Sequence, residues 1–339
     1  MIIERLAPFR HGLVRAFTID IGATILLILS FLLVAPTLFG VIRSVGDPLS
    51  GEHYHRQADT FSVAVNFLEH PNFFYPRVHH DSGTTGIRGM EAPIYPYLIS
   101  LSMRVFGESD WVGRLVCALF FLVAFGALMT LRTPVDDAPR SSSLIVIAVA
   151  SPMTLYYARQ IQPDMPMVAL GVLGVVLALR SHDQPWWKML IASLVFGLGM
   201  LTKYPLIFVW PALVAASNRW RWSEWRTILI RCALTLIPLA MLVAWIKWSA
   251  GLDAAYAKGD LYFASTPKSS EIIKNLKSIN VAHSIGWILP YYAIAFPAFA
   301  VVISGFVISF RAPYRRYAAP FWIWLLGAFG IAIVFWPRF

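Results

Sequence analysis

Long apolar runs recur along this chain, and several reach the roughly 20 residues that an α-helix needs to cross the hydrocarbon core of a bilayer. Of the 339 residues, 58% are hydrophobic and 14% are charged, whereas a soluble domain carries about 25% charged residues. The alternating pattern of outer-membrane strands is missing from the runs. The sequence therefore predicts an all-α polytopic membrane protein, folded as a single transmembrane domain over residues 1–339.

The apolar runs predict about nine transmembrane helices. The first span covers residues 16–42, and the others lie at about 111–131, 142–161, 165–180, 188–203, 204–217, 227–249, 283–309 and 317–337. Arg5, Arg10 and Arg15 precede the first span, which by the positive-inside rule predicts a cytoplasmic N-terminus. Alternate counting then places the Arg-rich loops in the cytoplasm, and we expect a multi-pass protein of a bacterial-type inner (plasma) membrane.

The same count puts residues 43–110 on the outer, periplasmic face as one long loop, with residues 111–339 holding the remaining spans. Within the loop, residues 94–106 are apolar, but a helix of that length would rise only about 20 Å, so we expect it to lie at the membrane interface. The net charge of +10 is spread over short loops between spans. Topology explains this charge better than nucleic-acid binding, and no nucleic-acid partner is expected.

Near its start, the outer loop contains GEHYHRQADT, residues 51–60, which is rich in ionisable side chains. If residues 54–69 form a helix, a narrow polar stripe runs along one face of it, made of His55, Asp59, Ser62 and Asn66. This pattern is typical of an interfacial helix that turns its polar side toward a cavity. A solvated face on an ordinary surface helix is the alternative.

Other polar residues stand at the ends of predicted spans. Arg159 lies at the outer end of one predicted span, and Asp164 lies at the start of the next. Lys203 lies between two other apolar runs, and Glu91 precedes the interfacial segment. An acid beside a membrane span is a functional candidate by default. The alternatives are a helix-capping role for Asp164, a snorkelling role for Lys203 and a simple rim charge at Glu91.

Three stretches, in this order, resemble the GT-C glycosyltransferase superfamily, in the branch of lipid A aminoarabinose transferase and protein mannosyltransferases. They are EAPIYPYLISLSMRVFGESDWVGRL (91–115), YYARQIQPDMPM (156–167) and LTKYP (201–205), and the resemblance covers roughly residues 15–215. It implies an enzyme that takes a sugar from a polyprenyl-phosphate carrier at the periplasmic face. The acceptor would be a lipid, a glycan or a protein of the cell envelope.

The chain departs from the family pattern at two places. The Asp-Glu pair usual in the outer loop would fall on Arg56 and Gln57, with Asp59 one turn later, and Glu91 stands where a Lys is common. The catalytic carboxylate is therefore assigned to Asp59. Relatives often continue beyond the last span, so the resemblance also implies a truncated chain or a compact version that lacks a C-terminal module.

The expected chemistry assigns a role to each candidate. Negative charge gathers on the departing polyprenyl phosphate, and preorganised cations would stabilise it; the candidates are Lys203, Arg159, Arg56 and Arg88. An inverting transfer needs a base on the opposite face of the sugar, which would be Asp59. The remaining candidates would orient the substrate or hold a divalent metal ion, a cofactor that the sequence leaves open; they are Asp164, Glu91 and His55.

Two other classes fit a polytopic chain. A transporter or flippase of a lipid-linked or anionic substrate would also place charges at helix ends, but inverted repeats and broken helices are not visible in the sequence. A non-catalytic membrane scaffold would explain the spans but not the ordered motifs. The sequence therefore favours the transferase.

Overall fold

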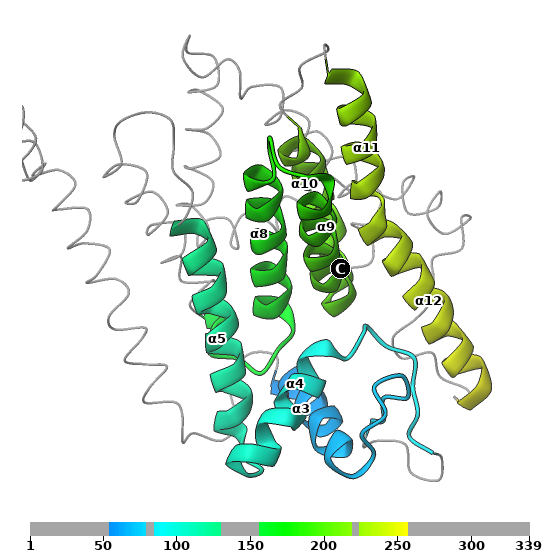
Figure 1. Cartoon of the computed structure of the whole chain (residues 1–339). Helices are drawn as coiled ribbons and strands as arrows, with labels where there is room; N and C mark the ends of the chain where they lie inside the picture. The colour runs from blue at the N-terminus through cyan, green and yellow to red at the C-terminus, as the bar shows by residue number, and fades with distance from the viewer. Residues whose placement is uncertain (1–53, 79–84, 130–155, 219–223, 257–339) are drawn as a thin grey trace, which may run out of the picture.

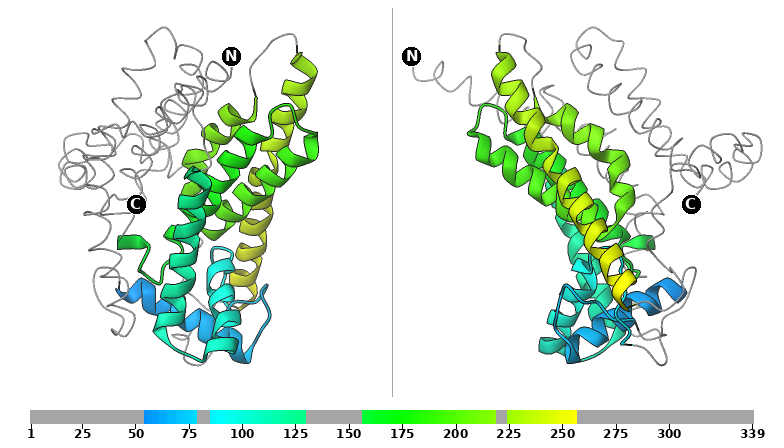
Figure 2. Two further views of the ribbon diagram at one scale, coloured as in Figure 1. Left: turned by 60° about the vertical axis from the view of Figure 1, so that its left-hand side comes forward. Right: turned by 90° about the vertical axis from the view of Figure 1, so that its right-hand side faces the viewer.

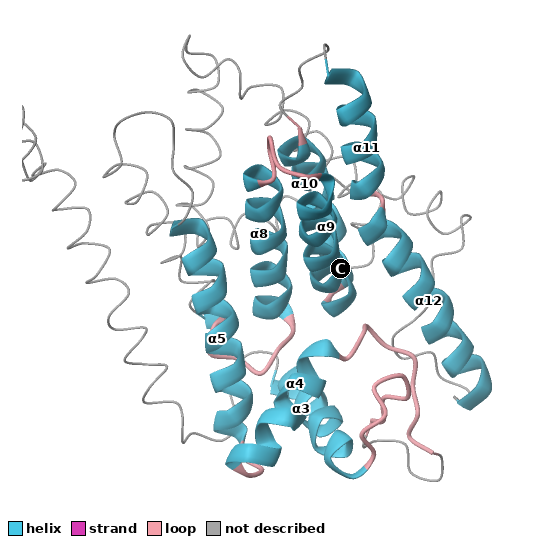
Figure 3. Cartoon of the chain, in the orientation of Figure 1, coloured by secondary structure: helices cyan, strands magenta, loops and turns pink. Residues whose placement is uncertain are grey.

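A computed structural model describes residues 54–78, 85–129, 156–218 and 224–256 of the chain. All regular elements within these ranges are helices, apart from one isolated antiparallel bridge between Arg77 and Ile87 (Figure 3). The predicted spans at 16–42, 283–309 and 317–337 lie outside the described residues, as does most of the span at 142–161. The helical class is confirmed for the described part, and the count of nine stays a prediction.

Two helices, α3 and α4, lie across one end of a helix bundle (Figures 1 and 2). The bundle holds α5, α8, α9, α10 and the rod formed by α11 and α12. The bounds are α3 Tyr54–Glu69, α4 Ile94–Phe106, α5 Asp110–Met129, α8 Asp164–Arg180, α9 Trp186–Thr202, the 3₁₀ helix η3 Tyr204–Val209, α10 Trp210–Ser217, α11 Trp225–Thr235 and α12 Ile237–Tyr256.

Two described stretches are long and apolar enough to cross a membrane, Asp110–Leu128 and Trp225–Tyr256. Shorter apolar helices cover Trp186–Thr202 and Tyr204–Ser217. The two helices expected at 54–69 and 94–106 are present, since α3 and α4 begin and end at the predicted residues. Their position at a membrane interface stays a prediction.

The span predicted at about 227–249 falls within the apolar stretch Trp225–Tyr256. The structure forms this stretch from two helices, α11 and α12, which are separated at Leu236. Pro238 explains the break, because proline lacks an N–H and its ring clashes with the carbonyl one turn earlier. α12 then continues to Tyr256, beyond the predicted end of the span. Its buried stripe also continues, with a spacing of three or four residues from Leu242 to Asp253, so packing extends the helix.

The run at 204–217 also differs from a single helical span. It forms η3 and then α10, with a proline in the first turn of each, Pro205 and Pro211. Proline is well tolerated at a helix start because the first N–H groups have no partner within the helix. The two prolines therefore restart the helix instead of ending it.

Helices α8 and α9 pack closely because glycines line their contact. A methyl group at Gly174 of α8 would come within 2.7 Å of Phe196 Cβ, and one at Gly199 of α9 would come within 3.0 Å of Leu170 Cβ. Small residues let two helix backbones approach in this way, as in many membrane bundles. The close contact fixes the relative position of the two helices.

The buried apolar side chains form two cores, and the first turn of α8 stands where the cores meet. One core joins α3, α4 and α5 and includes Met165. The other joins α8, α9, α10 and α12, and Met167 packs against it. Any polar side chain in this first turn is therefore positioned by both halves of the described fold.

At the opposite end of the bundle, the buried Arg231 of α11 binds the ends of two other helices. Its guanidinium donates to Ser181 Oγ at 2.9 Å and to the carbonyl oxygens of Ser181, Ser217 and Gln184 at 2.6, 3.2 and 3.1 Å. The last carbonyls of a helix lack intrahelical donors. Arg231 supplies these donors and ties α8 and α10 to α11.

Replacing Arg231 with alanine should destabilise the fold by on the order of 3 kcal/mol, because the carbonyls would stay buried without donors. Thermal unfolding of the detergent-solubilised protein measures this. Arg226→Ala is the matched control, since Arg226 is exposed on the same helix and stacks on Trp225. Equal melting temperatures for the two variants would contradict the structural role of Arg231.

Candidate active site

Lys203 occupies the break between α9 and η3. Its backbone is extended, with φ −157° and ψ 122°, so the chain leaves α9 here and η3 begins at the next residue. The Lys203 N–H still bonds to Gly199 O at 3.2 Å. The side chain leaves the helix axis and forms an ion pair with Asp164, with only 10% of the lysine side chain exposed. The ammonium group is thus paired and buried instead of snorkelling toward water.

Asp164 is the first residue of α8. The N-cap position is held by Pro163, and no side chain caps this helix end, so Asp164 does not act as a side-chain cap. Its Oδ1 accepts from Lys203, and the positive end of the helix dipole also favours a carboxylate there. Its Oδ2 is buried and has no hydrogen-bond partner in the described part of the chain. An acceptor of this kind is available to a bound ligand.

Glu91 lies beside the ion pair. The N–H of Ala92 donates to Leu201 O at 2.9 Å, which holds this segment against the last turn of α9. Burial raises the pKa of Glu91 above its ordinary value, while the positive charges of Lys203 and Arg56 and a hydrogen bond from the Tyr204 backbone act in the opposite direction. These couplings place Glu91 in the same charge cluster as the ion pair.

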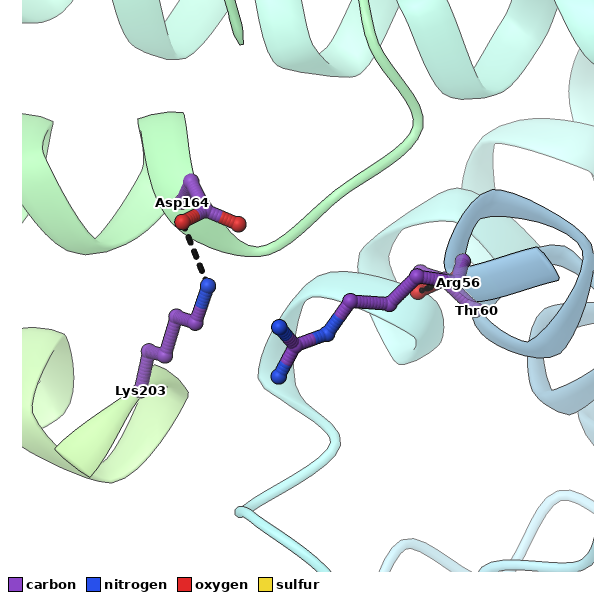
Figure 4. A network of polar contacts seen from close by, with 4 residues as sticks. All are labelled: Arg56, Thr60, Asp164 and Lys203. Carbon is purple, nitrogen blue, oxygen red and sulfur yellow. Dashed lines mark hydrogen bonds and ion pairs between the residues drawn. The ribbon is translucent and has the colours of Figure 1, made fainter. Parts of the chain in front are cut away.

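Arg56 comes to the cluster from α3. Figure 4 shows its side chain reaching toward Asp164 and Lys203, although the Arg56 residue is largely exposed. The neighbouring Gln57 explains how α3 is fixed, because its buried Oε1 accepts from Ile161 N at 3.3 Å in the turn before α8. This contact of Gln57 was not predicted from the sequence, because an uncharged amide in a polar stretch does not stand out as a structural residue.

The structure therefore brings four of the predicted residues together, Arg56, Glu91, Asp164 and Lys203. We call them the charge cluster. They come from α3, from the segment before α4, from α8 and from the end of α9. The opposite charges of Lys203 and Asp164 are largely buried. They interact more strongly than in water because the effective dielectric constant around them is lower. The cluster can bind a ligand that carries both an anionic group and hydroxyl donors.

The structure gives the burial or local contacts of the other predicted site residues, but not a place for them in the charge cluster. Asp59 is half-buried on α3, about one turn after Arg56. Arg88 is buried and its N–H bonds to Pro76 O at 3.1 Å. Arg159 stacks its guanidinium over the Tyr156 ring at 5.7 Å. His55 is exposed beside the Tyr54 ring. Their predicted roles stay predictions.

A metal site finds no donor set in the described residues. Among them, no three His, Cys, Asp or Glu side chains gather in a group that could hold a metal ion. His53, His79 and His80 of the outer loop lie outside these residues. The divalent ion left open by the sequence therefore gains no support from the described residues.

Lys203→Met should destabilise the fold by about 3 kcal/mol, because it leaves Asp164 largely buried and unpaired. Adding Asp164→Asn to the same chain should restore part of that stability, since the unpaired charge is then gone. Thermal unfolding in detergent compares the single and double variants, with Lys247→Met as a control at an exposed lysine. A double variant that melts below Lys203→Met would contradict the pairing.

Glu91 should make the stability of the fold depend on pH in a defined direction. Its pKa in the folded chain lies above the ordinary value of 4.5, so just above pH 4.5 the folded state binds more protons than the unfolded state. Stability then falls as pH rises through this window. Glu91→Gln should remove that fall, so the variant gains stability relative to the parent as pH rises. Parallel unfolding curves against pH would refute the buried position of this carboxyl.

Comparison with known proteins gives two findings. Residues 90–248 match the family model of dolichyl-phosphate-mannose-protein mannosyltransferases. The fold is similar to the crystal structure of ArnT from Cupriavidus metallidurans in the apo state, with a TM-score of 0.50 and 19% sequence identity. That alignment covers 91% of this chain and 59% of the ArnT chain. No curated protein matches the chain.

The family match spans Glu91, Asp164 and Lys203, and therefore three of the four members of the charge cluster. The structural match, at this identity, concerns the fold, and it extends over most of the chain. The two findings agree with the resemblance found in the sequence: residues 90–248 are similar to the mannosyltransferase family, and the fold is similar to that of ArnT.

Proposed function

We propose that this chain is a membrane glycosyltransferase that moves a sugar from a polyprenyl-phosphate donor to a lipid, glycan or protein acceptor. The observation that carries the proposal is the charge cluster. Its four members come from segments far apart in sequence, and three of them lie within the residues that match the mannosyltransferase family model. A purely structural ion pair would not need Glu91 and Arg56 beside it.

The cations of the cluster serve the leaving group. Cleavage of the bond between the anomeric carbon and the phosphate oxygen leaves negative charge on the polyprenyl phosphate, while the sugar gains oxocarbenium character. Lys203 and Arg56 provide fixed positive charge for that phosphate, which lowers the barrier because no reorganisation is needed during the reaction. Arg88 and Arg159 provide further positive charge near the same segments. The bound phosphate shares Lys203 with Asp164.

The carboxylates serve the sugar and the acceptor. Asp164 Oδ2 is buried without a partner, and it accepts a hydrogen bond from a sugar hydroxyl in the proposed complex. Glu91, in the same charge cluster, orients the donor. Asp59, on the same helix as Arg56, takes the proton of the attacking acceptor group as that group bonds to the anomeric carbon with inversion. The proposed roles of His55 and of a divalent ion are limited to substrate orientation.

The proposed orientation puts the charge cluster at the periplasmic face. The cluster lies toward α3 and α4, at one end of the bundle (Figure 1). Trp186 and Trp225 begin α9 and α11 toward the other end, and both are exposed. Exposed tryptophans mark a membrane interface, and their loops carry the Arg residues that favour the cytoplasm. A periplasmic site would meet lipid-linked donors in the outer leaflet of the inner membrane.

Asp59→Asn should leave the protein inserted and folded but lower sugar transfer by roughly 100-fold or more, because general base catalysis contributes a factor of that size. The assay incubates the purified chain with a panel of polyprenyl-phosphate sugars and candidate acceptors and follows both by mass spectrometry. Asp110→Asn is the matched control, since Asp110 is also half-buried and starts a neighbouring helix.

Each outcome separates the alternatives. Full transfer by Asp59→Asn would remove Asp59 from the mechanism. Movement of lipid-linked sugar across a vesicle membrane without chemical transfer would favour a transporter or flippase. No turnover and no transport by the parent chain, with any member of the panel, would favour a scaffold.

A further inference from the structure

A short segment before α4, residues 88–92, carries Glu91 to the charge cluster; we call it the strap. Backbone hydrogen bonds fix its two ends, from Arg88 N to Pro76 O and from Ala92 N to Leu201 O. Its middle is held by α12, which is more than 150 residues away in sequence. Trp245 Nε1 donates to Met90 O at 2.8 Å. The strap is therefore an irregular segment whose position depends on a distant helix.

The strongest bond between the strap and α12 is made by Asp253. The N–H of Gly89 donates to Asp253 Oδ1 at 2.7 Å, a short hydrogen bond of the charge-assisted kind. Only 6% of Asp253 is exposed, and its Oδ2 is buried without a partner in the described part of the chain. Burying a carboxylate in this way is costly. The hydrogen bond from Gly89 N–H partly offsets the cost of burying the Asp253 carboxylate.

Gly89 is the residue that this arrangement requires. A methyl group there would collide with the carbonyl oxygen of Ser249 and would come within 2.7 Å of Ser249 Oγ and 2.8 Å of Asp253 Oδ2. The carbonyl belongs to the helix backbone and cannot rotate away. Any side chain at position 89 would push the strap off α12 and break the hydrogen bond to Asp253.

We propose that Asp253 is a positioning residue: its hydrogen bond to Gly89 holds the strap on α12 and so keeps Glu91 beside Lys203. Glu91 is two residues from Gly89, and Tyr204, next to Lys203, donates to Met90 O at 3.4 Å. A loss of the Asp253 bond therefore releases the strap at Gly89, two residues before Glu91, while the bonds to Met90 O remain. The effect on transfer rests on the proposed function, whereas the effect on the strap does not.

Hydrogen exchange of the full chain in detergent tests the bond without using activity. In Asp253→Ala, the amides of residues 86–92 should exchange at least several-fold faster, because the acceptor for Gly89 N–H is lost. Asp253→Asn should exchange like the parent, since its amide oxygen can accept the same bond. Unchanged exchange in Asp253→Ala would overturn the proposal.

A glycine pair gives a second test on the same two segments. Gly89→Ala should raise exchange across residues 86–92, because the added methyl cannot be accommodated against α12. Gly251→Ala is the matched control, since a methyl at this position on α12 meets nothing within 4 Å. If Gly89→Ala does not fold, the Asp253 variants still decide the question. Equal exchange in the two glycine variants would count against the strap contact.

Sugar transfer then tests whether the bond acts through Glu91. Asp253→Ala should lower kcat at least tenfold, Asp253→Asn should rescue it, and Asp253→Ala should have little further effect in a chain that already carries Glu91→Gln. Residues that act through one contact are non-additive in this way. Full additivity would overturn the positioning role. If the parent transfers no sugar, the proposed function fails, and the exchange measurements still decide whether Asp253 holds the strap.

Discussion

The ion pair between Lys203 and Asp164 joins the end of α9 to the start of α8 in a chain where burying charge is costly. Neither charge could be buried alone, because each needs the other to offset the loss of hydration. The close glycine-lined packing of α8 and α9 brings their ends within reach. The pair in turn sets the place to which Glu91 and Arg56 come. The geometry of the candidate site therefore follows from one buried interaction and the helix packing behind it.

The site is built from segment ends and not from helix faces. Lys203 lies in a helix break, Asp164 at a helix start and Glu91 in the strap, so each side chain depends on contacts made by its neighbours. Gln57, Trp245 and Asp253 supply those contacts from α3 and α12. Irregular backbone is held by polar side chains that reach it from regular helices. Irregular backbone at membrane depth is tolerated where it is buried in protein in this way.

Elements with a clear period could be predicted from the sequence. α3 and α4 have the expected bounds, and α8 and α9 differ from expectation by one or two residues. Prediction failed at prolines and at Asp253. Pro238 divides a continuous apolar run, and Asp253 lies beyond the predicted end of the span at residue 249. In the structure, the buried stripe of α12 runs through Asp253, and an acid in this stripe is stable there because a backbone N–H from the strap reaches it.

The sequence by itself determined the helical membrane class, the resemblance to the GT-C transferases and the presence of Asp164, Lys203 and Glu91 near segment ends. Apolar length, periodicity and short ordered motifs are local properties, so they can be recognised along the chain. Only the tertiary structure decided that these three residues meet, that Arg56 joins them and that Gln57 and Asp253 hold their segments. Those contacts join residues up to 164 positions apart, and such a pairing is set by the packing of helices, which no local pattern encodes.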